Sequence, residues 1–362
     1  MKVAVACGGT GGHVFPGLAT ARELMRRGHD VTLWLTGRPT EHAATHEWPG
    51  HMVQVPAQGF SSFRSLKVFQ TLWRLHGARR KCRLEMKRAV PDVLLAMGSY
   101  ASVGPCAAAV SLGVPVVLHE ANVIPGRAVR LLSRRAVAVA VGFEETRFHL
   151  SNAQVEVVGV PLREELILSA RAMPPREAAI HHPFRLLIAG GSMGAHKLNE
   201  IAMRTLPGLA KKDIEIQVMH LTGREDEAAV RTAYEAAGIP ADVSAFTTNM
   251  APLYHTADLA ICRAGASTCA ELAFFGVPAL FVPYPFAAMD HQMENARALE
   301  KRGTSDVVAE TALTSEWLEA YLTEMISRPE RLARLREAAR KEGVRDGTQA
   351  LAALVERCAR SS

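Results

Sequence analysis

The sequence predicts an α/β protein with two parallel sheets, each covered by helices on both faces. Short apolar runs alternate with stretches of helical period along nearly the whole chain, and this scheme occurs twice, once in each half. The chain has 362 residues, which is long enough for two domains because a domain averages roughly 150 residues. We therefore expect two similar halves joined by a linker.

The expected elements follow in chain order. In the first half, buried strands are predicted at 2–7, 30–35, 52–55, 92–97, 114–119 and 136–141, each followed by a turn and a helical pattern. A polar, proline-containing stretch then marks a boundary, which gives domains of residues 1–162 and 163–339. In the second domain, strands are predicted at 184–189, 214–219, 243–246, 259–262, 279–283 and 305–308, and residues 329–360 are predicted to be helical. Because open parallel sheets bind ligands at the carboxyl ends of their strands, the motifs that follow strands should face a cleft between the halves.

Composition and charge narrow the class of protein. Hydrophobic residues make up 48% and charged residues 22%, which is typical of a globular protein with a large core and excludes a disordered or collagen-like chain. The formal net charge of +6 favours a phosphate-bearing or anionic-surface partner, and no nucleic-acid partner is predicted. The six cysteines form no Cys-x-x-Cys pair, as expected for free thiols in a reducing compartment. We expect neither a signal peptide nor a membrane span, and so a cytosolic protein that is able to lie on a membrane surface.

A glycine-rich turn follows the first predicted strand. It contains Gly8, Gly9, Thr10, Gly11, Gly12 and His13. So many glycines let a phosphate or a sugar approach bare backbone amides. The turn lacks the Gly-Lys-Ser/Thr of a Walker loop, and Val14 stands where a Rossmann fingerprint needs its third glycine. No acid ends the second strand, so a dinucleotide site is not expected.

Two further turns of this kind occur in the second half. The turn after the strand at 184–189 contains Gly190, Gly191, Ser192, Met193, Gly194 and Ala195. It is typical of an anion site, and the alternative is that its glycines only permit tight packing of helix on sheet. The turn after the strand at 259–262 contains Arg263, Ala266, Ser267, Thr268 and Glu271. Its arginine and amides suit a diphosphate and its carboxylate suits ribose hydroxyls, whereas the alternative is a capping box formed by Thr268 and Glu271.

Polar residues gather at two other places. His119, Glu120 and Asn122 end the strand at 114–119, and three such residues together favour a ligand-facing cluster, although ordinary surface polarity explains any one of them. Gln292 shares a helix face with Asn295 after a proline-rich turn. Taken alone, that pair is more typical of a solvated helix start than of a sugar site.

In their order and spacing, these motifs resemble the MurG family of glycosyltransferases, which is glycosyltransferase family 28. The resemblance covers residues 3–302 and rests on the segments 8–18, 97–105, 115–122, 157–163, 190–199 and 262–295. It implies a GT-B fold, with two Rossmann-like domains facing each other across a cleft and a terminal helix, about 340–362, that packs back on the first domain. It also implies a hexosyltransferase that moves N-acetylglucosamine from UDP-N-acetylglucosamine to the C4 hydroxyl of the muramyl sugar of lipid I, with inversion, forming lipid II. The enzyme would then act in peptidoglycan synthesis, and so in cell shape and division, at the cytoplasmic face of the inner membrane.

The resemblance assigns roles to individual residues. In the first domain, which binds the acceptor, the residues that reach the donor are Thr10, Gly11, Gly12 and Asn122, and Arg163 reaches it from the linker. In the second domain, the residues that hold UDP and the sugar are Ser192, Thr247, Ala266, Ser267, Thr268, Glu271 and Gln292, with Arg263 adding charge. The residues on the acceptor side are Tyr100 and Ser102. Departures from the family pattern at Ala121, Val160 and Met193 and in the loop 98–105 concern the fit of the acceptor more than the donor chemistry.

Inverting transfer requires a base for the acceptor hydroxyl and stabilisation of charge on the departing diphosphate. His13 is the leading candidate for the base, because imidazole titrates near neutral pH, and Glu120 is the rival. The alternative for His13 is a structural hydrogen bond within the glycine-rich turn. The sequence contains no Asp-x-Asp pair, so no obligatory metal is predicted, which leaves room for a non-essential divalent cation.

Residues 60–88 combine aromatic with basic side chains, and Glu85 is the only acid among them. The residues assigned to a membrane-facing surface are Phe69, Trp73, Arg79, Arg80 and Lys81. This composition is expected for docking on anionic lipid, and the alternative is a packed helix with a solvated basic face.

Three other functions share part of these features. They are an isomerase of the UDP-N-acetylglucosamine 2-epimerase kind, another GT-B glycolipid synthase with a different acceptor, and a nucleotide-sugar-binding regulator without catalysis. Loss of the donor without any acceptor would indicate the epimerase.

Overall fold

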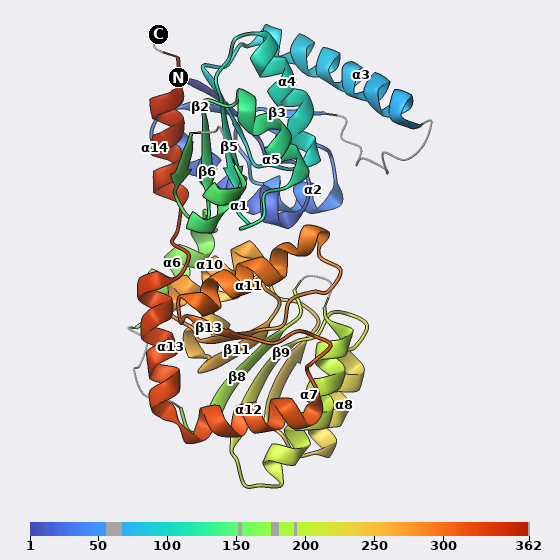
Figure 1. The fold of residues 1–362 in the computed structure, drawn as a ribbon, viewed down its shortest axis with the longest axis vertical. Helices are drawn as coiled ribbons and strands as arrows, with labels where there is room; N and C mark the ends of the chain where they lie inside the picture. Colours follow the sequence, from blue (N-terminus) through green and yellow to red (C-terminus); the bar gives the residue numbers. More distant parts are fainter. Residues whose placement is uncertain (56–66, 151–153, 175–180, 192–193, 361–362) are drawn as a thin grey trace. The chain divides into compact units, whose positions relative to one another are not determined.

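The structure is a computed structural model that describes residues 1–362 except 56–66, 151–153, 175–180, 192–193 and 361–362, with the backbone alone at 40, 67–76 and 342. The chain divides into two compact units (Figure 1). Unit 1 comprises Met1–Arg163 and Arg345–Ser362, and unit 2 comprises Glu164–Val344. Each unit contains one parallel sheet with helices on both faces, so the predicted fold class is confirmed.

Unit 1 has a seven-stranded sheet in the order β3-β2-β1-β4-β5-β6-β7. Its strands are β1 Lys2–Ala6, β2 Asp30–Leu35, β3 Met52–Gln54, β4 Val93–Ala96, β5 Val116–Glu120, β6 Ala138–Val141 and β7 Val155–Val157. Its helices are α1 Gly11–Arg26, α2 Pro39–Thr45, α3 Lys67–Arg88, α4 Val103–Ser111, α5 Arg127–Leu132 and α14 Thr348–Cys358, with 3-10 turns η1 Tyr100–Ser102, η2 Ser133–Arg135 and η3 Glu144–His149. The strand β7 was not predicted, because its three residues are only partly buried and form no apolar run.

The strand β1 is buried on both faces, as expected for a central parallel strand. Val3 and Val5 belong to a core cluster that includes Leu351 and Leu354 of α14, whereas Ala4 belongs to a second cluster on the other face. The helix α14 packs against α1 (Figure 1). The last helix of the chain therefore completes one face of unit 1.

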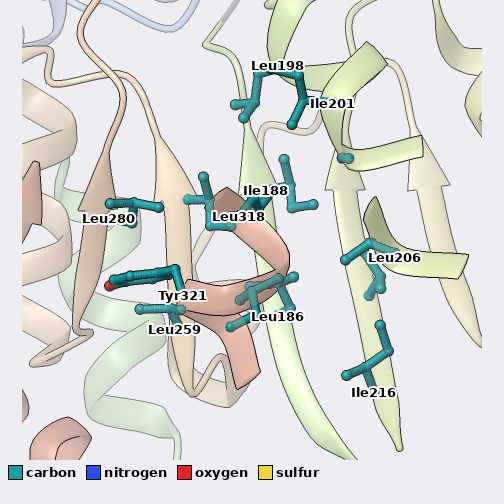
Figure 2. Close-up of a cluster of buried hydrophobic side chains, with 14 of the residues drawn as sticks. Leu186, Ile188, Leu198, Ile201, Leu206, Ile216, Leu259, Leu280, Leu318 and Tyr321 are labelled. Atoms are coloured by element: carbon teal, nitrogen blue, oxygen red, sulfur yellow. The ribbon is translucent and has the colours of Figure 1, made fainter. Parts of the chain in front are cut away.

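Unit 2 has a six-stranded parallel sheet in the order β10-β9-β8-β11-β12-β13. Its strands are β8 Phe184–Ala189, β9 Ile216–Leu221, β10 Ala241–Ser244, β11 Leu259–Cys262, β12 Ala279–Phe281 and β13 Ser305–Val307. Its helices are α6 Glu164–Ala172, α7 His196–Ala210, α8 Glu227–Ala236, α9 Ala251–Thr256, α10 Ala266–Phe275, α11 His291–Lys301, α12 Ser315–Ser327 and α13 Pro329–Glu342, with the 3-10 turn η4 Ala288–Asp290. In the core, shown in Figure 2, Leu186 and Leu259 from the strands meet Leu318 and Tyr321 from α12.

The single helix predicted at 329–360 is wrong, because the structure has α13 and α14 there with a break between them. Gly343 ends α13 in an extended conformation with a ψ of 172°. After the break, the amide of Gly347 donates to the carbonyl of Val160 at 3.1 Å, and Asp346 forms a β-bridge with Val160. These contacts hold the returning chain beside the segment that leaves unit 1. None of the helices in the described part of the chain is long and apolar enough to span a bilayer.

Candidate active site

The glycine-rich turn of unit 1 joins β1 to α1. Gly9 has a φ of +135°, and a Cβ on Gly17 in the following helix would lie 2.3 Å from the Cβ of Cys7, so both positions require glycine. Thr10 is exposed, and its hydroxyl lies 3.0 Å from Nδ1 of the half-buried His13. The structural hydrogen bond considered for His13 is therefore present, and solvent still reaches part of the ring.

Arg163 lies near the start of α1 through Phe15, whose ring would lie 3.2 Å from a Cβ on Gly11. Its guanidinium lies 5.4 Å from the centroid of the Phe15 ring, and that ring is 39% exposed. The structure therefore brings residues 10–12 and Arg163 to one place within unit 1.

His119, Glu120 and Asn122 lie together at the carboxyl end of β5. His119 is buried and donates from Nε2 to the carbonyl of Gly159 at 3.0 Å, and burial lowers the pKa of its imidazole to about 4. The Glu120 carboxylate accepts from the backbone and side-chain amides of Asn122 at 3.0 and 3.1 Å and from the amide of Gly126 at 2.8 Å. Glu120 is only 5% exposed, so the half-buried His13 is the more accessible of the two candidate bases.

The candidate acceptor residues follow β4 in the turn η1. The ring of Tyr100 is 41% exposed and therefore accessible to a ligand. Ser102 is fully buried, and its hydroxyl donates to the carbonyl of Ala6 at 3.3 Å. This geometry does not support a direct contact of Ser102 with the acceptor, because the hydroxyl is used inside unit 1.

The glycine-rich turn of unit 2 joins β8 to α7. A Cβ on Gly190 would lie 2.3 Å from the amide nitrogen of Ala195, so the turn is tightly folded. The turn packs against the chain that follows β9, because a Cβ on Gly194 would lie 2.3 Å from the carbonyl oxygen of Thr222. Asn199 of α7 donates to the same carbonyl at 2.8 Å and to the carboxylate of Asp226 at 2.7 Å. Tight packing of this turn is thus observed. Ser192 and Met193 lie outside the described residues.

The third turn leads from β11 into α10. The helix begins at Ala266, with Gly265 at its N-cap, and Ser267 and Thr268 complete its first turn. The capping-box alternative is wrong, because Thr268 lies inside the helix and Glu271 instead accepts a hydrogen bond from the hydroxyl of Tyr254 at 2.9 Å. Since the first amides of a helix have no partner within it, this turn presents donors suited to an anion.

Arg263 supports the neighbouring loop. Its guanidinium forms an ion pair with Glu310 at 2.5 Å, donates to the carbonyl of Val282 at 2.9 Å and lies 5.5 Å from the centroid of the Tyr284 ring. Arg263 is 11% exposed and already has a carboxylate partner. Its geometry therefore suits holding the loop after β12.

Gln292 lies in the first turn of α11 and accepts a hydrogen bond from the amide of Tyr284 at 2.9 Å. Just before it, Met289 and Asp290 both have a positive φ, of 55° and 57°. Two consecutive non-glycine residues in this conformation are strained, and such strain gathers at functional sites. Thr247, half-buried after β10, accepts from the amide of Asn249 at 3.1 Å.

The described part of α3 presents a basic surface. Arg79, Arg80 and Lys81 are exposed, and Leu84 is 56% exposed beside them, while the opposite face packs against α4. The side chains of Phe69 and Trp73 lie outside the described residues. In the described ranges, no group of three or more His, Cys, Asp and Glu side chains is placed to hold a metal ion.

Tyr254 and Glu310 belong to this site and were not predicted from the sequence. Tyr254 lies 17 residues before its partner Glu271, and Glu310 lies 47 residues after its partner Arg263. No local motif links either pair, so only the folded sheet reveals them.

Two α/β units, each with a parallel sheet and a glycine-rich turn after a central strand, are typical of the GT-B class of glycosyltransferase folds. The chain belongs to glycosyltransferase family 28, since residues 3–141 match the N-terminal domain of that family and residues 185–351 match its C-terminal domain.

Similar proteins align with nearly the whole chain. One from Acidithiobacillus ferrooxidans is 37% identical over 361 residues, covering 99% of this chain and 98% of its own, and one from Geobacter metallireducens is 36% identical over 353 residues, covering 97% of each. Both are named UDP-N-acetylglucosamine--N-acetylmuramyl-(pentapeptide) pyrophosphoryl-undecaprenol N-acetylglucosamine transferase. The crystal structure of Acinetobacter baumannii MurG has a TM-score of 0.81 at 29% identity and covers 98% of this chain and 99% of its own. A UDP-GlcNAc 2-epimerase from Neisseria meningitidis, with a TM-score of 0.70 at 15% identity over 99% of this chain and 100% of its own, shares the fold alone.

Proposed function

We propose that this protein transfers N-acetylglucosamine from UDP-N-acetylglucosamine to the C4 hydroxyl of the muramyl sugar of lipid I, an undecaprenyl-pyrophosphoryl muramyl-peptide, and so forms lipid II. The observation that carries the proposal is the full-length identity of 36% and 37% to relatives whose names state this kind of transfer. The product is a precursor of peptidoglycan, so the reaction serves cell-wall biogenesis and thereby cell shape and division.

The proposed reaction inverts the anomeric carbon. The acceptor hydroxyl attacks that carbon, the bond from the carbon to the diphosphate oxygen breaks, and UDP leaves with the electron pair. His13 takes the hydroxyl proton, because its ring is half-buried and accessible while Glu120 is 5% exposed and held by neighbouring amides. Glu120 in this scheme orders Asn122 and the end of β5.

Unit 2 holds most of the donor in this proposal. The first turn of α10, residues 266–268, supplies amides and the positive end of the helix to the diphosphate. Glu271 takes the ribose hydroxyls, Gln292 the sugar and the backbone of Thr247 the uracil, while Ser192 is assigned to the diphosphate by family resemblance alone. From unit 1, residues 10–12, Asn122 and Arg163 complete the donor contacts.

We propose that no metal is obligatory, because helix amides and the macrodipole can carry the charge that grows on the diphosphate. Turnover should then persist when EDTA is added to metal-free buffer. A complete loss of turnover in EDTA, restored by Mg²⁺, would overturn this part of the proposal.

The decisive experiment measures UDP release from UDP-N-acetylglucosamine with and without a lipid-linked muramyl-pentapeptide analogue. UDP-N-acetylgalactosamine serves as the donor control. Acceptor-dependent release that is selective for the glucosamine donor supports the transferase. Donor loss without acceptor would instead indicate an epimerase, and binding without turnover would indicate another acceptor or a non-catalytic role.

We also propose that the protein binds the cytoplasmic face of the inner membrane peripherally through α3. Three exposed cations, Arg79, Arg80 and Lys81, are expected to contribute about 1 kcal/mol each on an anionic surface. Reversing all three to Glu should abolish sedimentation with vesicles that contain phosphatidylglycerol. The matched control reverses three exposed cations of unit 2, Arg204, Lys211 and Lys212, and should sediment like wild type. Binding that ignores both the anionic lipid content and the α3 reversal would contradict the docking proposal.

A further inference from the structure

The buried carboxylate of Glu41 joins two turns of unit 1. Glu41 is 1% exposed and lies in the first turn of α2, after β2. Its Oε1 atom accepts from the amide of Gly9 at 2.7 Å and from the hydroxyl of Thr36 at 2.5 Å. Its Oε2 atom accepts from the amides of Thr36 at 2.7 Å and Gly37 at 2.8 Å.

The hydrogen-bonding capacity of this carboxylate is full. An ionised carboxylate offers about four lone-pair sites, and the four short contacts use them. Burial acts to raise the pKa of Glu41, but the hydrogen bonds from the Thr36 hydroxyl and the surrounding amides hold that pKa below its ordinary value. Glu41 is therefore an ionised internal group that has no site left for a substrate, and it can act only through the groups it holds.

The contact with Gly9 is the informative one. The bonds to residues 36 and 37 are local, and so is a longer one of 3.4 Å from the amide of Arg38, the N-cap of α2. A carboxylate in the first turn of a helix commonly accepts from amides that precede that helix. Gly9 lies 32 residues away and belongs to the turn that carries Thr10 and His13. On the other side of that turn, the hydroxyl of Ser99 donates to the carbonyl of Gly8. The turn is thus held between Glu41 and Ser99.

We propose that Glu41 is a positioning residue of the transfer reaction. Its carboxylate occupies the amide of Gly9 in the turn after β1, where a Rossmann-type unit would hold a phosphate, and it thereby fixes the turn that presents Thr10 and His13. The amide of Gly9 is consequently unavailable to a substrate phosphate. The catalytic part of this inference rests on the proposed function, whereas the anchoring of the turn does not.

The surroundings of Glu41 allow a chemical test. A pocket of about 240 Å³ is lined by Leu35, Gly37, Glu41, His42, Thr45 and Gln54, among others. In Glu41→Ala, the space left by the carboxylate would join this pocket, so that a small anion is able to enter and take its place among the same amides. Formate is the probe, and chloride at equal ionic strength is its control.

Hydrogen–deuterium exchange of a peptide covering residues 8–14 measures the anchoring directly, without any substrate. We expect faster exchange there in Glu41→Ala and renewed protection in formate but not in chloride. In the transfer assay, kcat/KM should fall about 100-fold, because a small displacement of a catalytic group costs this much, and formate should restore it several-fold. The fall should lie in kcat rather than in the KM for UDP-N-acetylglucosamine. Because partial unfolding would also lower the apparent kcat, the recovery in formate but not in chloride is the result that separates positioning from instability.

Glu23→Ala is the matched control, because Glu23 is another buried carboxylate of unit 1, paired with Arg26 and Arg27 on α1. It should lower the unfolding temperature and leave formate without effect. If Glu41→Ala does not fold, Glu41→Gln replaces it, since the Gln amide group would face N–H donors and should loosen the same peptide. Unchanged exchange at residues 8–14 in a folded variant, or equal effects of formate and chloride, would overturn the proposal. A wild-type protein without turnover would contradict the proposed function alone. The exchange experiment needs no substrate, so it would still test whether Glu41 anchors the turn at residues 8–14.

Discussion

The glycine-rich turns of the two units occupy the same place in the fold but are held in different ways. In unit 1 the turn after β1 donates the amide of Gly9 to a carboxylate from the neighbouring turn. In unit 2 the turn after β8 packs against the carbonyl of Thr222, and the nearby acid, Asp226, pairs with the side chains of Asn199 and His196. The shared framework places a turn at the end of a strand, and the residues packed around it decide which chemistry the turn can perform.

This difference suggests a division of labour. A turn that donates one amide to an internal carboxylate and carries a histidine suits a base and a sugar hydroxyl. A helix start, whose first amides have no partner within the helix, suits a diphosphate. The predictions below test whether the proton transfer indeed belongs to unit 1 and the nucleotide to unit 2.

The largest expected effect is that of His13→Ala. Loss of a general base should lower kcat by about 100- to 10,000-fold and leave the affinity for UDP-N-acetylglucosamine unchanged, as measured by UDP release and by calorimetry. His196→Ala is the comparison in unit 2, because His196 is an exposed histidine at the start of α7 and pairs with Asp226. We expect a far smaller change there. Turnover of His13→Ala within several-fold of wild type would move the base to Glu120 or to a group outside this turn.

The second effect concerns pH, because each unit buries a histidine. Burial lowers the pKa of His119 in unit 1 to about 4 and that of His220 in unit 2 to about 3, from 6.5. Between these values and 6.5 the unfolded chain binds more protons than the folded chain, so stability falls as the pH is lowered through this range. At pH 5 each histidine should cost about 2 kcal/mol of unfolding free energy relative to pH 7 or above.

Urea denaturation at pH 7 and pH 5 measures this loss in the wild type and in two variants. His119→Gln should remove the pH-dependent loss of stability in unit 1, and His220→Gln should remove that in unit 2. Hydrogen exchange in peptides from β5 and β9 follows the two units separately. An identical pH dependence in all three proteins would show that other groups titrate in this range.

The third expected effect is a change in the KM for UDP-N-acetylglucosamine, caused by substitutions in the proposed nucleotide site. Glu271→Gln should raise the KM for UDP-N-acetylglucosamine about 20-fold with a smaller change in kcat, since a hydrogen bond to a charged group contributes about 1.5–3 kcal/mol. Tyr254→Phe removes the hydroxyl that donates to Glu271 at 2.9 Å and should raise this KM less. If either variant lowered kcat and left KM unchanged, the assignment of the ribose to unit 2 would be wrong.

The buried strands could be predicted well from the sequence, whereas the side-chain contacts between distant residues could not. The strands at 30–35, 184–189 and 259–262 agree with the structure to the residue, because buried parallel strands are continuous apolar runs. The exposed β7 and the break at Gly343 gave no such signal. The pairs Glu41 with Gly9 and Arg263 with Glu310 could not be predicted, because they join residues 32 and 47 positions apart that meet only after the sheets form.

The smallest expected effect is a loss of unfolding free energy at α14, the helix by which the end of the chain returns to unit 1. Unit 1 depends on α14, which returns to it at the end of the chain. Glu356 of α14 accepts from Arg27 at 2.7 Å and from His29 at 2.8 Å, two residues that lie between α1 and β2. These groups are partly exposed, so Glu356→Gln should lower the unfolding free energy by only about 1 kcal/mol. Leu351→Ala, in the buried face of the same helix, should cost about 2–5 kcal/mol.

Hydrogen bonds from His29 and Arg27 lower the pKa of the Glu356 carboxyl, so its contribution is present at neutral pH and is lost as the pH falls through that lowered pKa. The difference in urea midpoint between wild type and Glu356→Gln should therefore be smaller at pH 3 than at pH 7. Exchange should become faster in residues 348–358 while α13, which belongs to unit 2, stays unchanged. An effect of Glu356→Gln as large as that of Leu351→Ala would mean that the ion pair, and not the apolar face of α14, holds the end of the chain on unit 1.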